Sequence, residues 1–421
     1  MADGPGGPAQ GAEDVRTLRG RPVTLAGGRT LTVALIVLCL SLQALTIGGL
    51  ALFLPRVREE LGLSYGQGGS LAATASLVYA FLQMPAGYLA DRLGPRRLFL
   101  TGALGVCLLS FTFGLVQGYW QALANQAALG VAWSLLFAPG LVLMTGRFPP
   151  ERRATAMGLY VAAGFSLPIV LLNLVGPALE DALGWRRVFT LFALMGLAFV
   201  ALFARYVREE GHPGGRQRGE PARALALFAS PIMWVIAVIQ YVRMSVVVGL
   251  TTWLPTFLVD EHDLSLRAAS LVVALSFSLT AVSPFLGGYL SDRLRSPTRI
   301  IGASLVALAV ANAGLASVHW LPALVLLIAL TGFFMQMYFG PLFSLPLEML
   351  GPRMAGVASG YGNFFANLGS FSFAYALGAI KDSTGSFDAG FYALALACTL
   401  SALLSLPLAR MRQRAAATPA A

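Results

Sequence analysis

The sequence predicts an all-α membrane protein with twelve transmembrane helices arranged as two six-helix bundles. Of its 421 residues, 57% are hydrophobic and only 11% are charged, and the mean hydropathy is +0.73. A soluble domain carries about 25% charged residues, so the composition excludes a soluble fold. Two further observations support the prediction: apolar segments of membrane-spanning length, and a phrase of seven residues that occurs twice.

The apolar segments are long enough to cross the hydrocarbon core of a bilayer, which takes about 20 residues in a helix. Some exceed 25 residues, which favours tilted helices. Each is predicted to form one transmembrane helix. The twelve segments are residues 31–55, 67–90, 98–117, 119–146, 154–178, 187–205, 229–257, 265–291, 300–318, 321–348, 355–380 and 389–409.

The repeated phrase divides the chain into two equivalent parts. Residues 87–93 read GYLADRL and residues 288–294 read GYLSDRL, 201 positions later. Two other pairs lie at nearly the same offset: Leu-Pro at 54–55 and at 254–255, and glycine at 184 and at 385. A repeat of this length in a membrane protein is typical of transporters built from two related bundles.

The repeat and the local composition together set the expected regions of the chain. Residues 1–29 are rich in Gly, Pro and Arg and are predicted to be a disordered cytoplasmic N-terminus. Residues 30–205 and 229–410 are predicted to form the N-terminal and C-terminal six-helix bundles. Residues 206–228 have the composition of a polar cytoplasmic linker, and residues 411–421 form a cytoplasmic tail.

The net charge of +10 reflects topology and does not indicate a nucleic-acid partner. If residue 1 is cytoplasmic, the cytoplasmic segments hold 22 of the 29 basic residues, and the opposite side holds six. This excess follows the positive-inside rule. We therefore expect a multi-pass protein of the plasma membrane, here a bacterial inner membrane, with both termini in the cytoplasm.

The motif around the repeated phrase resembles that of the major facilitator superfamily, and the resemblance covers residues 30–410. The family motif, Gly-x-x-x-Asp-Arg-x-Gly followed by basic residues, is matched by Gly87, Asp91, Arg92, Gly94 and Arg96. A second copy keeps Gly288, Asp292 and Arg293 but has Arg295 where glycine is expected. The resemblance implies that these residues help to latch the cytoplasmic face, with partners among Glu151, Arg152, Arg153, Glu348 and Arg353.

One charged side chain lies in the middle of a predicted span. Arg243 is midway along the seventh segment, and no Asp, Glu or His lies deep in any span. An arginine at the bilayer centre costs at least about 2.5 kcal/mol and by default faces an aqueous path. Since a guanidinium suits a carboxylate or phosphate, we expect Arg243 to bind an anionic substrate. The alternative is a structural role, in which it bonds helix-end carbonyls or a carboxylate.

Other polar side chains within the spans extend the candidate substrate site. By repeat register Gln43 corresponds to Arg243, and Gln240 shares a helix face with Arg243. The eleventh segment is similar to the corresponding helix of carboxylate and organophosphate transporters of the superfamily. Polar side chains in membranes also join helices without touching substrate. The remaining candidates are Tyr79, Gln83, Asn363, Asn367, Gln336 and Tyr338, the last two just before an expected kink at Gly340-Pro341.

These observations predict a secondary active or facilitative transporter that moves a small organic anion, most simply a carboxylate, by alternating access. The expected partners are this anion, a co-transported or exchanged ion and the lipid bilayer, with no nucleic acid, and we expect a monomer. No cofactor is expected, and the three cysteines have no metal-binding spacing. Exchange, facilitated diffusion or co-transport of the protonated substrate fits a chain without a carboxylate deep in the membrane.

Three other functions compete with this prediction. The first is an exporter of drugs or other metabolites, in which Arg243 is structural. The second is a nutrient sensor, which would usually carry a large cytoplasmic tail. The third is a membrane enzyme, but the sequence has no nucleophile–base pair, metal cluster or phosphate-cradling loop, so we do not expect an enzyme.

Overall fold

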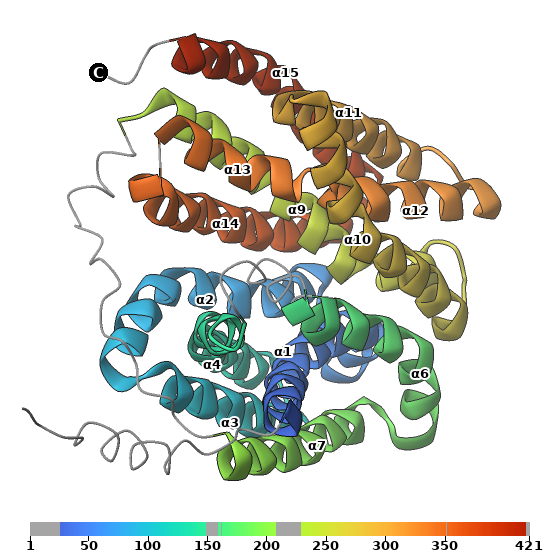
Figure 1. Cartoon of the computed structure of the whole chain (residues 1–421). Coiled ribbons are helices and arrows are strands. Elements are labelled where there is room, and N and C mark those ends of the chain that lie inside the picture. The colour runs from blue at the N-terminus through green and yellow to red at the C-terminus, as the bar shows by residue number, and fades with distance from the viewer. Residues whose placement is uncertain (1–25, 149–158, 161, 208–228, 351, 418–421) are drawn as a thin grey trace, which may run out of the picture.

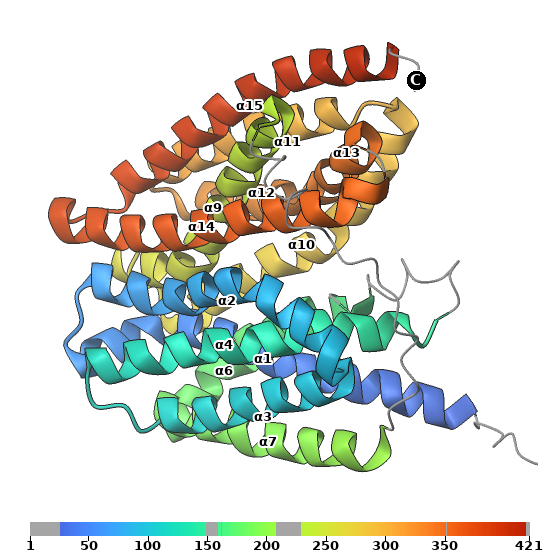
Figure 2. The same cartoon turned by 90° about the vertical axis from the view of Figure 1, so that its left-hand side faces the viewer.

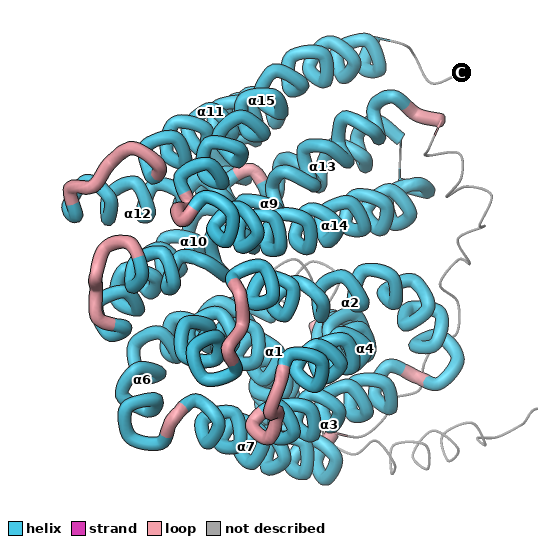
Figure 3. Tube along the Cα trace, turned by 180° about the vertical axis from the view of Figure 1, so that it is seen from behind, coloured by secondary structure: helices cyan, strands magenta, loops and turns pink. Residues whose placement is uncertain are grey.

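The computed structural model of the protein describes residues 26–148, 159, 160, 162–207, 229–350 and 352–417. Within these residues every regular element is a helix (Figure 3). Ten of the helices are long and apolar enough to cross a membrane. The chain is therefore a multi-pass, all-α membrane protein.

The helices fall into two sets, which we call the N-half and the C-half. The N-half comprises α1 (Ala26–Leu61), α2 (Tyr65–Leu93), α3 (Pro95–Phe113), α4 (Tyr119–Thr145), the π-helix η2 (Ala162–Ser166), α6 (Leu167–Leu183) and α7 (Trp185–Tyr206). The C-half comprises α9 (Pro231–Asp260), α10 (Leu266–Leu294), α11 (Pro297–Leu315), α12 (Leu321–Met337), α13 (Phe339–Leu350), α14 (Pro352–Thr384) and α15 (Asp388–Ala417).

Where the structure describes them, the twelve predicted segments coincide with helix; residues 154–158 and 161 of the fifth lie outside the described residues. The fifth corresponds to η2 and α6, and the tenth is broken at Tyr338 between α12 and α13, next to the expected kink at Gly340-Pro341. Two ends differ from the expected regions. Helix α1 already begins at Ala26, and α15 continues to Ala417 because its last turns contain good helix formers such as arginine and alanine.

Backbone conformation repeats between the halves as the sequence does. Six described residues have positive φ angles, and they form three pairs, each 201 positions apart: Gly62 with Asp263, Gly94 with Arg295, and Gly184 with Gly385. All six lie beside helix ends, where a left-handed residue turns the chain. The repeat therefore fixes the same chain reversals in both halves, even where the glycine has been replaced.

The three largest contacts between the halves are made by pairs of helices. Helix α2 packs on α14, α6 packs on α10, and α1 packs on α9. Exchanging the halves converts the first pair into the second and leaves the third unchanged, as a two-fold relation requires. Figure 1 shows the N-half below the C-half, with α2 next to α14. Both described chain ends lie at one end of the molecule (Figure 2), and we call the opposite end the distal end.

Close packing between α2 and α14 depends on glycine. A Cβ atom at Gly69 would lie 2.3 Å from the carbonyl oxygen of Ala374, and one at Gly378 would lie 2.4 Å from that of Tyr65. Such small residues let two backbones approach directly. Neither α2 nor α14 is among the ten helices that are long and apolar enough by composition to cross a membrane.

Candidate substrate site and distal seam

Arg243 is buried at the middle of α9 and has two polar partners. Its side chain is 4% exposed. Nε donates to the Gln240 side-chain oxygen at 2.9 Å, and Nη1 donates to the Gln336 side-chain oxygen at 2.9 Å. The first contact confirms that Gln240 and Arg243 share a helix face. The second joins α9 to α12.

The break between α12 and α13 supplies the surroundings of Arg243. The ring of Phe339 lies 5.2 Å from Arg243 Cζ and is 41% exposed, which is within reach of a cation–π interaction. Tyr338 is fully buried, and its hydroxyl forms no hydrogen bond among the described residues. No described carboxylate forms an ion pair with Arg243, so its charge is balanced only by amide dipoles and an aromatic face.

Gln43 occupies the position on α1 that corresponds to Arg243. It is 4% exposed, and its side-chain oxygen is enclosed without a hydrogen-bond partner in the described part of the chain. The described hydrogen bonds of Arg243 go to Gln240 and Gln336 and not to Gln43. Since α1 and α9 pack together, Gln43 and Arg243 lie on neighbouring helices without bonding each other.

The remaining polar candidates form a contact across the two halves. The Asn363 amide nitrogen on α14 donates to the Gln83 side-chain oxygen on α2. Asn367 donates to the Asn363 carbonyl at 2.8 Å, and Tyr79 lies half-buried one turn before Gln83. The phenyl rings of Phe81 and Phe364 also meet across this interface, with centroids 5.5 Å apart. The structure thus brings Tyr79, Gln83, Asn363 and Asn367 to one place, and none of them is a described hydrogen-bond partner of Arg243.

The first motif copy holds the turn between α2 and α3. Gly94 has φ +83° and precedes α3, and Arg96 donates to the carbonyls of Val207 at 2.5 Å and Ala204 at 2.9 Å, where α7 ends. Arg92 is exposed at the last turn of α2. The surroundings of Gly87, the side chains of Asp91 and Arg353, and residues 151–153 (Glu151, Arg152 and Arg153) lie outside what the structure describes.

The second motif copy lies on α10 of the C-half. Gly288 is half-buried there, and Asp292 and Arg293 are exposed. Glu348 pairs with Arg412 on α15, with Oε2 and Nε 2.8 Å apart. This pair lies within the C-half, so the described contact of Glu348 does not join the halves.

A cluster at the distal end, which we call the distal seam, was not among the sequence candidates. It comprises Arg58, Tyr65, Asp260 and Asp382. The Asp382 carboxylate on α14 accepts the backbone N–H groups of Tyr65 at 2.8 Å and Gly66 at 2.6 Å, the first residues of α2. The Tyr65 hydroxyl donates to Asp260 at 2.9 Å. Asp382 therefore caps, from one half, a helix that belongs to the other.

The surrounding charges strengthen the distal seam. Arg58 lies 3.6 Å from Asp260 and 3.3 Å from the centre of the Tyr65 ring. Behind it, Lys381 pairs with Glu261 at 2.6 Å, both largely buried. Among pairs with both partners described, the ion pairs that join the halves are Arg58–Asp260 and Arg267–Asp181, and both involve residues at the distal end.

The repeat offers a signal for this seam. Asp181 and Asp382 lie 201 positions apart, and so do their partners Gly66 and Arg267. The two contacts are therefore equivalent under the relation between the halves, although one uses a backbone N–H and the other a guanidinium. An acidic residue at the same place in both repeats was visible in the sequence as a candidate for contact between halves.

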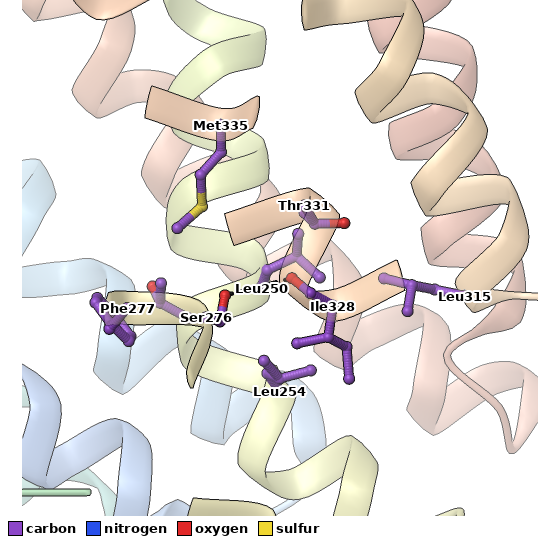
Figure 4. A pocket seen from close by; sticks show the side chains of 9 residues that line it. Leu250, Leu254, Ser276, Phe277, Leu315, Ile328, Thr331 and Met335 are labelled. Atoms are coloured by element: carbon purple, nitrogen blue, oxygen red, sulfur yellow. Dashed lines mark hydrogen bonds between the residues drawn. The ribbon is translucent and has the colours of Figure 1, made fainter. Parts of the chain in front are cut away.

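Two cavities lie away from Arg243. One is a small void inside the C-half between α9, α10 and α12, lined by apolar side chains with Ser276 and Thr331 (Figure 4). The other is an open groove of about 500 Å³ beside Asp382, lined also by Gln67, Tyr119 and Tyr375. Among the described residues no group of three His, Cys, Asp or Glu side chains could hold a metal ion.

The sequence matches the family model of the Major Facilitator Superfamily over residues 36–374. The chain therefore belongs to this superfamily, whose members are transporters and not enzymes.

Similar proteins are transporters of anions. The "Probable sulfoacetate transporter SauU" of Cupriavidus necator is 26% identical over 84% of this chain and 87% of its own length. The hexuronate transporter of Bacillus subtilis is 23% identical over 81% of this chain and 85% of its own length. The nitrite extrusion protein of the same organism is 21% identical over 84% and 90%.

The fold has a solved counterpart. A bacterial homologue of the human lysosomal transporter Spinster, in an inward-facing and unoccupied conformation, superposes with a TM-score of 0.75 at 18% identity. The match covers 94% of this chain and all of the other. This similarity shows the fold alone.

Proposed function

We propose that this protein transports a small organic anion, a carboxylate or sulfonate, by alternating access, with Arg243 as the charge that holds it. The observation that carries the proposal is a buried guanidinium without a counter-ion among the described carboxylates. A buried cation is strongly destabilised unless it is paired. Two amide oxygens reduce this cost, and a bound oxyanion would complete the pairing.

The relatives support an anion as the substrate. Their names specify sulfoacetate, hexuronate, galactonate and nitrite, which are all anions. A drug exporter that selects cations would need an acidic group at the site, whereas Arg243 is surrounded by Gln240, Gln336 and Phe339. Gln43, Gln83 and Asn363, on α1, α2 and α14, are our candidates for contacts with the rest of the substrate.

The halves would rock about this site. Helices α1–α7 and α9–α15 would move as the two bundles, with the segment 206–228 as their linker and both termini in the cytoplasm. The distal seam then closes the outer side, which supports an inward-facing state like that named for the Spinster homologue. On the inner side we assign the latch to the motif residues, with Asp91 and Arg92 in one half and Asp292 and Arg293 in the other.

Counterflow in proteoliposomes tests the proposed function. Vesicles loaded with one unlabelled anion are given a trace of the same labelled anion, using sulfoacetate, D-glucuronate, D-galactonate, D-glucarate and nitrite in turn. We expect labelled uptake of at least one organic anion, and none in vesicles without protein. Preferential counterflow of a cationic or neutral drug, or of no anion in the panel, would refute the proposal.

A further inference from the structure

The partners of Arg243 have an orientation that the arginine itself imposes. A guanidinium only donates hydrogen bonds, while a carboxamide has an accepting oxygen and a donating nitrogen. Gln240 and Gln336 must therefore turn their oxygens towards Arg243, as both 2.9 Å contacts show. Their Nε2 groups then point away from the guanidinium, and each presents two N–H donors elsewhere.

In the described part of the chain these outward nitrogens and Nη2 of Arg243 have no acceptors. Among the described residues none of the three forms a hydrogen bond, and none is one of the buried polar atoms sealed from solvent. The contact between Nη1 and Gln336 is only partly buried, whereas that between Nε and Gln240 is buried. This difference follows from Gln336, which is half-buried, whereas Gln240 and Arg243 are buried, so the accessible space lies on the Gln336 side of the guanidinium.

Resting on the proposed function, we propose that Arg243, Gln240 and Gln336 form a head-group site that offers donors only and selects the fully ionised carboxylate or sulfonate. The protonated acid or the amide of the same substrate brings its own O–H or N–H group. The glutamine oxygens that could accept this hydrogen already accept from Arg243, whose positive charge repels the added proton, so the neutral head group binds more weakly than the ionised one. A coupled proton would have to travel elsewhere than on the acid group held by Arg243.

Gly362 on α14 keeps space beside this site. A Cβ atom there would lie 3.6 Å from Gln240 Cγ and 3.7 Å from Gln240 Nε2. These are ordinary van der Waals distances, so alanine fits without distorting the helices. The added methyl group would instead cover the donating nitrogen of Gln240. Gly362 is therefore assigned as a specificity-determining position next to the head group.

The first test separates a donor role from a merely structural one at Gln336. Gln336→Glu keeps an acceptor for Arg243 but removes the N–H donors, whereas Gln336→Met removes both functions. If Gln336 only satisfies Arg243 and neither side chain meets the anion, the glutamate variant, whose carboxylate pairs with Arg243, should transport as well as wild type and better than the methionine variant. We expect the reverse. Gln336→Glu should have a KM for the anion at least about tenfold above that of wild type, and also above that of Gln336→Met. The melting temperature of Gln336→Glu should not fall.

The second test addresses the ionised head group directly. The panel anion that wild type carries fastest is competed with its own carboxamide or sulfonamide. We expect the ionised form to inhibit at concentrations at least about tenfold lower than the amide, and equal inhibition would overturn the inference. Gly362→Ala should raise the KM, while the matched control Gly249→Ala, whose Cβ would also meet only side chains at 3.7 Å or more, should not.

The outcomes distinguish this inference from the proposed function. In one outcome Arg243→Gln abolishes anion counterflow, Gln336→Glu transports like wild type, and the amide inhibits as well as the ionised anion does. Arg243 then binds the substrate, and the donor-only site is wrong. If Arg243→Gln transports anions normally, the proposed function itself fails.

Discussion

Asp382→Asn is predicted to open the distal seam. In the wild type one carboxylate accepts two backbone N–H groups at the start of α2, at 2.8 Å and 2.6 Å. The asparagine oxygen can keep one of them, and its NH2 group cannot accept the other. A hydrogen bond to a charged group contributes about 1.5–3 kcal/mol, and the helix N-terminus adds about 0.3–1 kcal/mol.

The exposure of Asp382 decides which end of these ranges applies. Its carboxylate is accessible to solvent, so water screens the interaction and the lower values are appropriate. A loss of about 1.5 kcal/mol shifts the equilibrium between closed and open seam about tenfold towards open. The magnitude is large enough to change accessibility and too small to unfold the protein.

A cysteine placed in the seam reports this shift. Ala374 is fully buried on α14, with its carbonyl against Gly69, so Ala374→Cys should react with a maleimide only when the halves separate there. In detergent, Asp382→Asn should raise the labelling rate about tenfold, while the neighbouring Ser383→Ala should leave it unchanged. The native cysteines are buried and give a slow background. Equal labelling with and without Asp382→Asn would refute the assigned role of this carboxylate.

Two further predictions concern stability. Arg295 has φ +48° at the position of Gly94 in the other half, and a left-handed conformation costs a non-glycine residue about 1–2 kcal/mol. Arg295→Gly removes this strain but makes the unfolded chain more flexible, which offsets part of the gain. The free energy of unfolding should therefore rise by about 0.5–1 kcal/mol, and a lower melting temperature would contradict this. At the distal end, burial lowers the pKa of His262 below 6.5, opposed mainly by Glu261. The neutral ring is favoured in the folded protein, so its contribution is present above about pH 6.5 and lost as the pH falls. The melting temperature should decrease between pH 7.5 and 5.5, and by less in His262→Phe, which keeps the ring contact with Phe257 at 4.8 Å; an identical decrease in both proteins would show that His262 is not responsible.

Helix positions could be predicted from the sequence because they depend on local composition. Each long apolar segment must satisfy its backbone within one helix when it is in lipid, so the twelve segments required no knowledge of packing. The break at Tyr338 was also predictable, because Gly340-Pro341 lies beside it. Arg243 could also be identified from local sequence, because a charged residue within an apolar segment is costly in the membrane.

The contact of Asp382 with Tyr65 and the hydrogen-bond partners of Arg243 could not be predicted from local sequence. Asp382 and Tyr65 are 317 positions apart and look like ordinary residues at helix ends. Their contact depends on how two bundles pack, which no local pattern records. Repeat register suggested Gln43 as the polar group opposite Arg243, but the hydrogen bonds come from Gln240 and Gln336. The register relates equivalent positions in the two halves, and equivalent positions need not touch.

Anion counterflow with position 243 varied tests whether Arg243 holds the transported anion. Wild type, Arg243→Lys and Arg243→Gln are reconstituted at matched density, with the exposed Arg299→Gln as a control for loss of a positive charge elsewhere. We expect full activity for Arg299→Gln and no counterflow for Arg243→Gln. Arg243→Lys should have a raised KM, because lysine keeps the charge but lacks the planar donor pair. A folded Arg243→Gln protein that exchanges organic anions at the wild-type rate would contradict this role of Arg243.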